Sequence, residues 1–171
     1  MKILLTNYKD VFVAELRADK FTALVLPTEG GKIVSYKDCE GEEFLIQNPS
    51  PFYNHIGLFD SYVEGECSGF DEMFPTIDEL EFISSEKKIL YPDHGEVCRV
   101  PFNYEIINDA LVMTFVSVMG YTYTKTLTEV SGKLFVTCEI KNFTNKDLDA
   151  LWAGHCLIKA EIGGEILLPF L

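Results

Sequence analysis

The feature of this sequence that most constrains its fold is a series of short segments in which apolar and polar residues alternate, separated by turn signals. A period of two is typical of β-strands with one buried face. No stretch shows a sustained period of 3.6 residues, the period of a helix that packs on a core. Short strands with frequent turns predict an all-β sandwich or barrel. We expect strands at 11–16, 22–26, 32–36, 44–46, 110–118, 121–128, 133–141, 151–158 and 165–168.

Two of these segments show the alternation clearly. In 121–128 the threonines occupy one face, so the other face carries two tyrosines, Lys125 and Leu127. In 133–141 the apolar side chains at positions 134, 136, 138 and 140 are expected to face inward. Residues 107–110 read Ile-Asn-Asp-Ala and predict a tight hairpin turn.

The composition allows a substantial core and argues against polyanionic ligands. The 171 residues suggest one domain or a large part of one. Hydrophobic residues make up 47% of the chain, enough to bury a core. Lys+Arg 14 against Asp+Glu 27 gives a net charge of −13, whereas binding to nucleic acid or to anionic membranes needs cations. We therefore expect no nucleic-acid or membrane partner, and a neutral or cationic ligand.

The cysteines and the N-terminal residues favour a cytoplasmic location. The five cysteines include no C-x-x-C pair, and an odd number fits reduced thiols better than a disulfide scaffold. The apolar run at residues 1–5 is followed by Asn7 and Lys9. It is too short for a signal peptide or a membrane span.

Residues 48–96 interrupt the strand pattern and hold the candidate functional residues. Prolines and glycines punctuate this segment, and a connection of such length in a compact domain is usually functional or disordered. Its aromatic residues argue against disorder. We expect 69–76 and 91–96 to form loops, because Pro75 and Pro92 lack an N–H donor and restrict their neighbours. Loops held by a rigid scaffold often carry function.

The three histidines differ in their sequence surroundings. His94 lies between Asp93 and Gly95 in the irregular segment, which favours acid/base chemistry or ligand contact over a solvated loop histidine. His155 lies in the apolar segment 151–158, where a polar ring needs a partner or a function. A satisfied core histidine is the alternative. Strand alternation places His155 and Cys156 on opposite faces. His55 has no supporting context, and we expect a structural role.

Other chemistry is less well supported by the residue spacing. Asp71, Glu72, Asp93 and Glu96 could bind a divalent metal with His94, but their spacing matches no closed metal motif. We therefore expect no metal or cofactor. Cys98 lies near His94 in sequence, yet a thiol nucleophile would need a lowered pKa. The sequence contains no phosphate-binding loop and no Gly-x-Ser-x-Gly motif.

Aromatic residues near these acids suggest a sugar-binding cleft. Each aromatic side chain taken alone is more simply explained as core, but together with acids that bind hydroxyl groups they form a plausible carbohydrate site. A phosphorylated sugar is less expected because cations are few, although Arg99 and Lys125 leave it open. The aromatic residues concerned are Phe52, Tyr53, Phe70, Phe74 and Trp152.

Four segments, 23–31, 69–76, 92–96 and 151–155, resemble in this order the galactose mutarotase-like (aldose 1-epimerase) superfamily. The resemblance implies a β-supersandwich that interconverts the anomers of a free hexose, with one group removing the anomeric proton and another protonating the ring oxygen. By resemblance His155 matches the general-acid histidine, and His94 matches the histidine that precedes glycine and contacts the sugar. The candidate substrate-binding residues are Asp71, Glu72, Phe74 and Trp152.

Two departures from the family pattern are evident. The asparagine-arginine element that holds sugar hydroxyls is missing, and Asp71-Glu72 occupies about that place. The catalytic base of the family is a glutamate near the end of a longer chain, whereas Glu161 and Glu165 lie too close to His155 to match it.

We therefore expect residues 1–171 to be a single galactose mutarotase-like domain that lacks its C-terminal part. The apolar run at 166–171 would then leave an unfinished sheet edge that permits self-association. The alternative function is a non-catalytic carbohydrate-binding or sensing domain on the same scaffold.

Overall fold

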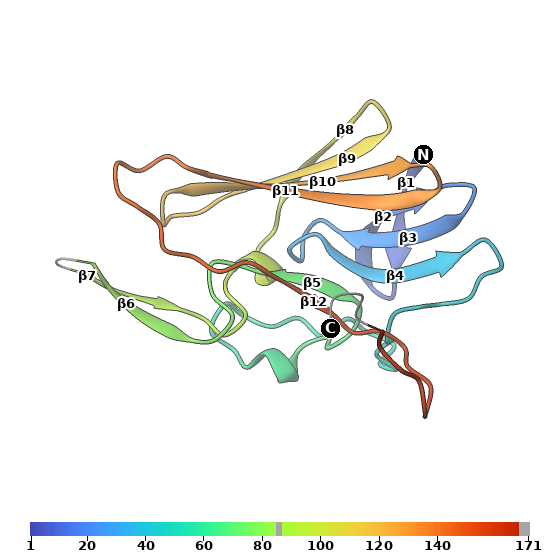
Figure 1. Cartoon of the computed structure of the whole chain (residues 1–171), viewed down its shortest axis with the longest axis horizontal. Coiled ribbons are helices and arrows are strands. Elements are labelled where there is room, and N and C mark those ends of the chain that lie inside the picture. The colour runs from blue at the N-terminus through green and yellow to red at the C-terminus, as the bar shows by residue number, and fades with distance from the viewer. Residues whose placement is uncertain (85–86, 168–171) are drawn as a thin grey trace.

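The structure, a computed structural model, describes residues 1–84 and 87–167 and is built from antiparallel β-sheets (Figure 1). One sheet has six strands, in the order β1 (Lys2–Tyr8), β2 (Val11–Arg17), β3 (Phe21–Leu26), β4 (Lys32–Asp38), β5 (Phe70–Met73) and β12 (Ala153–Cys156). The second has four strands, in the order β11 (Lys133–Asn142), β10 (Tyr121–Val130), β9 (Ala110–Val116) and β8 (Asn103–Ile107). The all-β expectation is confirmed.

A two-stranded hairpin and two 3₁₀ helices complete the described elements. The hairpin of β6 (Leu80–Ser84) and β7 (Lys87–Tyr91) projects beyond the two main sheets (Figure 1). The 3₁₀ helices η1 (Tyr62–Glu64) and η2 (Val97–Arg99) have three residues each. No helix in residues 1–84 or 87–167 is long and apolar enough to cross a membrane.

The two main sheets face each other and enclose the larger core. Leu16, Phe21 and Val25 from the six-stranded sheet pack with Leu111 and Leu127 from the four-stranded sheet. The alternation in β10 is confirmed, because the side chains at positions 121, 123, 125 and 127 are fully buried. Lys125 therefore lies in the core, where it needs a partner.

The turn at 107–110 also has the expected form. It joins β8 to β9, and Ile107 pairs with Ala110. Asn108 and Asp109 have φ values of 48° and 63°, as the central residues of a type I′ hairpin turn require.

The expected strand at 44–46 is reduced to an isolated bridge. Leu45 pairs with Ile158 alone. The Glu43 carboxylate accepts hydrogen bonds from the backbone N–H groups of Tyr36 and Leu45, so a side chain replaces part of the ladder between backbones. The strand expected at 165–168 is also not formed over 165–167, which are exposed; residue 168 lies outside the described residues.

Residues 69–76 were only partly the loop that we expected. Residues 70–73 form β5, whose neighbours in the six-stranded sheet are β4 and β12. Three of its four residues are buried, so the strand lacks the polar alternation that marks a half-exposed strand. Residues 74–76 and 92–96 are irregular, as expected, whereas Tyr91, also expected in a loop, is the last residue of β7. The segment before β5 covers the outer face of the sheet, where Tyr53 packs on Val13 and Val34.

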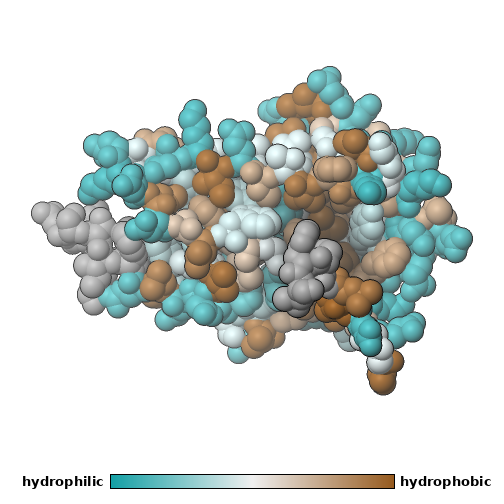
Figure 2. Space-filling view, viewed as in Figure 1, coloured by the Kyte–Doolittle hydropathy of each residue, from teal (hydrophilic) through white to brown (hydrophobic). Residues whose placement is uncertain are grey.

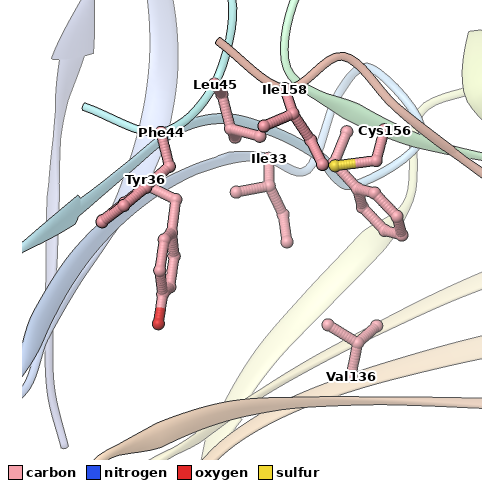
Figure 3. Close-up of a pocket in the computed structure, with 8 residues that line it drawn as sticks. Ile33, Tyr36, Phe44, Leu45, Val136, Cys156 and Ile158 are labelled. Atoms are coloured by element: carbon pink, nitrogen blue, oxygen red, sulfur yellow. The ribbon is translucent and has the colours of Figure 1, made fainter. Parts of the chain in front are cut away.

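Hydrophobic residues reach the surface of the molecule (Figure 2), and apolar side chains of the two sheets face each other beside β4 and β11 (Figure 3). A cavity of about 430 Å³ lies there, and Val136 of β11 faces Ile33 of β4 across it. Val136 and Ile140, which were expected to face inward, are 36% and 37% exposed and thus only partly buried. Both side chains belong to β11, the edge strand of the four-stranded sheet, and Val136 borders the cavity.

Candidate functional site

His94 and His155 lie side by side although 60 residues separate them in the chain. Their ring centroids are 5.1 Å apart, with the planes at 64°. Both rings pack on Tyr62 of η1: His94 stacks on it at 4.0 Å with parallel planes, and His155 meets it edge-on at 5.3 Å. The structure therefore brings both candidate histidines into one cluster with a tyrosine that the sequence analysis did not identify.

Strand pairing places His155. In the antiparallel pair of β12 and β5, His155 is the direct partner of Asp71, so the two side chains share one face of the sheet. One strand further, β4 pairs with β5 through Ile33 and Phe70, which sets Lys32 beside Asp71. A lysine, an aspartate and a histidine thus lie in a row across three neighbouring strands, on the face turned away from the larger core.

The backbone around Gly95 places His94. Gly95 forms a bridge with Phe74, and a Cβ atom at this position would lie 2.2 Å from the Phe74 carbonyl oxygen. Only glycine permits this close approach at a φ of +67°. The His94 N–H donates to the Ile77 carbonyl at 2.9 Å, and its Nδ1 lies 2.8 Å from Asp93 Oδ1.

Arg99 joins the two irregular segments that carry Tyr62 and His94. Its guanidinium donates to the carbonyl oxygens of Gly57 and Leu58 at 3.0 Å each. It also donates to the carbonyl of Asp93 at 2.8 Å. Because five donors in a fixed fork can hold several carbonyls at once, the buried Arg99 holds the chain before η1 against the loop of His94.

A line of polar contacts runs from Lys32 to His155. Lys32 Nζ lies 2.8 Å from Asp71 Oδ2, and both side chains are nearly inaccessible to solvent. The Tyr62 hydroxyl donates to the same Asp71 oxygen at 2.6 Å. His155 Nδ1 lies 3.2 Å from the Tyr62 hydroxyl oxygen. The imidazole is thereby connected to a buried ion pair through one tyrosine.

The surroundings oppose charge on both rings of this line. Burial, and secondly the nearby His94, lower the pKa of His155 below its ordinary value. Burial, followed by the charge of Asp71, raises the pKa of the Tyr62 hydroxyl. At neutral pH the site therefore presents a neutral imidazole and a protonated tyrosine.

The remaining substrate-binding candidates lie on the other face of the sheet. Glu72 is fully buried, with its Oε2 2.6 Å from Lys125 Nζ. Phe74 is buried in the larger core. Trp152 is half exposed, and its Nε1–H donates to the Tyr123 hydroxyl at 2.8 Å. Of the four candidates, Asp71 alone joins the histidine cluster, because neighbouring residues of a strand point to opposite faces.

The structure also shows the surroundings of Cys156, Cys98 and His55. Cys156 lines the apolar cavity between the sheets while His155 contacts Tyr62, so the two lie on opposite faces as the alternation predicted. Burial raises the pKa of the Cys98 thiol to about 12, so it is not a thiolate at neutral pH. His55 is exposed and lies 2.8 Å from Glu29.

The groups considered for a metal or a phosphate have other partners. Within the part of the chain that the structure describes, no three His, Cys, Asp or Glu side chains gather as a metal site. Arg99 donates to backbone carbonyls. Lys125 donates to Glu72 and to the Gly31 carbonyl. These contacts leave neither cation directed at an external phosphate.

Neither Lys32 nor Tyr62 was predicted as a site residue, because the position of each depends on a residue far away in the chain. Lys32 is the first residue of an expected strand, and its burial depends on an aspartate 39 positions away. Tyr62 lies in an irregular segment with no periodic pattern, so no local signal connects it with a histidine 93 positions later. Both depend on contacts between distant segments.

Comparison with solved structures shows that the chain has the galactose mutarotase-like fold. A galactose mutarotase-like protein from Clostridium acetobutylicum aligns over 92% of this chain with a TM-score of 0.63 and 16% identity. A galactose mutarotase related enzyme from Lactobacillus acidophilus aligns over 69% with a TM-score of 0.52 and 13% identity. A 4-alpha-glucanotransferase from Thermococcus litoralis aligns over 81% with a TM-score of 0.50 and 12% identity.

These matches concern the fold and part of each matched protein. The chain covers 54%, 39% and 24% of the three matched chains, in the order given. It therefore spans about half, or less, of the length of these structures. No protein-family model and no curated protein matches the sequence.

Proposed function

We propose that this chain binds a monosaccharide at the His94–His155 pair. We propose further that it acts as an aldose 1-epimerase-like protein, which interconverts the anomers of a free hexose. The observation that carries the proposal is the pair itself: two imidazoles from distant segments lie 5.1 Å apart at a partly exposed position. The fold, shared with galactose mutarotase-like proteins, supports a carbohydrate ligand.

The proposed reaction needs proton carriers that operate near neutral pH. Ring opening requires loss of the anomeric hydroxyl proton and gain of a proton at the ring oxygen, and histidine is suited to both tasks. We assign proton transfer to His155 and sugar contact to His94. Asp71 acts through Tyr62, since its Oδ2 is already bound by Lys32 and by the Tyr62 hydroxyl.

The other three substrate-binding candidates have an indirect role in this proposal. Glu72 and Phe74 follow Asp71 on the chain but contact Lys125 and the larger core. Trp152 precedes β12 and is held by Tyr123. We propose that all three support the site by fixing β5 and β12, the strands that hold Asp71 and His155.

A second candidate function is non-catalytic carbohydrate binding on the same scaffold. It is favoured by the state of the two carboxylates that lie beside the histidines. Asp71 is bound by Lys32 and Tyr62, and Asp93 lies 2.8 Å from His94 Nδ1. One oxygen of each carboxylate is therefore engaged in holding the site together, a role that sugar binding without catalysis also requires.

Mutarotation measured by polarimetry separates the two functions. We expect the intact protein to accelerate the equilibration of freshly dissolved α-D-glucose or α-D-galactose, and His155→Ala to remove about 10²-fold or more of that acceleration, the contribution of one general acid or base. His55→Ala, at an exposed histidine outside the cluster, is the matched control. Binding of an aldose without acceleration would favour the second function. Neither binding nor acceleration with any common aldose would overturn both.

A further inference from the structure

The direction of the hydrogen bonds between Lys32 and Tyr62 follows from which groups can donate. The Lys32 ammonium has only donors, and an ionised aspartate has only acceptors. Asp71 Oδ2 receives Lys32 Nζ at 2.8 Å and Tyr62 Oη at 2.6 Å. A tyrosine has a single hydroxyl hydrogen, and this short contact with a carboxylate uses it.

The contact between Tyr62 and His155 must then run in the opposite sense. With its hydrogen directed at Asp71, the Tyr62 oxygen can only accept a hydrogen bond from the nitrogen 3.2 Å away, which is His155 Nδ1. Nδ1 therefore carries a hydrogen. A neutral imidazole has only one N–H, so Nε2 of neutral His155 has none.

The ring of Tyr62 is held so that this arrangement persists. It stacks on His94 at 4.0 Å with parallel planes, and the preceding segment is tied to the loop of His94 by Arg99. The raised pKa of Tyr62 keeps the hydroxyl protonated. Among the described residues, the charged or titratable groups that act on His155 are Tyr62, His94, Asp71, Lys32 and Asp93.

We propose that Tyr62 is a positioning residue that fixes neutral His155 as the Nδ1–H tautomer, so that Nε2 offers a lone pair to a hydroxyl group of the ligand. The part that concerns the ligand rests on the proposed function. In this form His155 accepts a hydrogen bond from the sugar. It can donate from Nε2 only as an imidazolium, so the general-acid role that the resemblance implies belongs to the protonated form alone.

Nitrogen NMR of protein labelled with ¹⁵N-histidine tests the inference directly. The three histidines are assigned from single His→Gln variants. We expect neutral His155 to show a protonated Nδ1 and an unprotonated Nε2. In Tyr62→Phe, which keeps the ring and loses the hydroxyl, the Nδ1–H to Nε2–H ratio should fall by roughly tenfold, as expected for loss of one neutral hydrogen bond.

The control removes a hydroxyl from a tyrosine next to a different histidine. Tyr53 is buried and packs against His55 at 4.9 Å, so Tyr53→Phe should leave the His155 signals unchanged. An Nε2–H tautomer in the unaltered protein would overturn the inference, even if Tyr62→Phe did not fold. Unchanged His155 signals in a folded Tyr62→Phe would overturn it as well.

Failure of this inference is distinguishable from failure of the proposed function, because the tautomer is measured without substrate. The Nδ1–H tautomer in a protein that neither binds nor converts a hexose would leave the positioning role intact and reject the function. Mutarotation that depends on His155, together with an Nε2–H tautomer, would support the proposed function and reject the positioning role of Tyr62.

Discussion

His155 has two kinds of neighbour with opposite effects on its protonation. Burial and the adjacent His94 disfavour the imidazolium and lower the pKa of His155. Asp71 and Asp93 favour it, but their effects are smaller. The ring is thus neutral at a pH where a solvated histidine would already begin to take up a proton.

This shift predicts a pH dependence of stability. An unfolded histidine has a pKa of about 6.5, and the folded pKa is lower. As the pH falls through the unfolded value, the unfolded state binds more protons, so the free energy of unfolding decreases until the folded pKa is passed. We expect His155→Gln to make this decrease shallower. Urea denaturation at a series of pH values measures how the free energy of unfolding changes with pH in the unaltered protein and in the variant. An identical pH dependence in the two proteins would contradict the prediction.

Strands β5 and β10 belong to different sheets and are joined by a buried ion pair. Lys125 and Glu72 have fully buried side chains and lie 2.6 Å apart. Lys125 also donates to the Gly31 carbonyl at 2.7 Å. Burial raises the pKa of the Glu72 carboxyl, against the opposing effect of Lys125. This pair helps to fix β5, the strand that carries Asp71.

Removal of one partner should destabilise the protein strongly. Lys125→Met leaves the Glu72 carboxylate buried without its cation, which typically costs about 3–5 kcal/mol. The double variant Glu72→Leu/Lys125→Met removes both charges and should be closer to the unaltered protein. Both are measured by urea denaturation.

An exposed ion pair supplies the control for this experiment. Lys159 and Glu42 lie 2.9 Å apart, with side chains 57% and 62% exposed. Lys159→Met should lower the free energy of unfolding far less than Lys125→Met, because an exposed ion pair contributes little to stability. If Lys125→Met cost no more than this control, the buried pair would not stabilise the contact between the sheets.

The two sheets enclose a core at one side and leave an apolar cavity of about 430 Å³ at the other. Strand β11 borders this cavity as an edge strand of ten residues. Its outer edge pairs with no other strand of residues 1–84 and 87–167, and such an edge can accept another strand. A second copy paired antiparallel about Val136 would set Lys133 opposite Glu139 twice, a favourable cross-strand arrangement. We propose that the self-association expected from the sequence uses this edge of β11.

Sedimentation velocity over a range of protein concentrations tests this proposal. We expect reversible dimers, and we expect Val136→Asp to weaken them by placing two carboxylates at the centre of the paired strands. Val118→Asp changes the net charge equally at a fully exposed residue outside β11 and serves as the control. Dimerisation that is equally affected by both variants, or a monomer at all concentrations, would reject pairing through β11.

Part of the molecule could be predicted because the responsible interactions are local. The period of two in β10 placed Lys125 on one face with two tyrosines and Leu127, and the structure buries that face. The same alternation assigned His155 and Cys156 to opposite faces, and the turn at 107–110 followed from its two central residues. In each case the signal lies within a few neighbouring positions, since strand geometry and turn chemistry act over that range.

The features that could not be predicted from the sequence were determined by the tertiary structure. Residues 70–73 became a strand because β4 and β12 flank them, and no local pattern contains those neighbours. The sequence relates Asp71 to His94 and His155 through the expected sugar site, but it does not predict that Lys32 and Tyr62 connect Asp71 to His155. It also groups Glu72, Phe74 and Trp152 with the site, from which the sheet separates them. The composition of the site depends on which distant segments the sheet brings onto one face, and that is a property of long-range pairing.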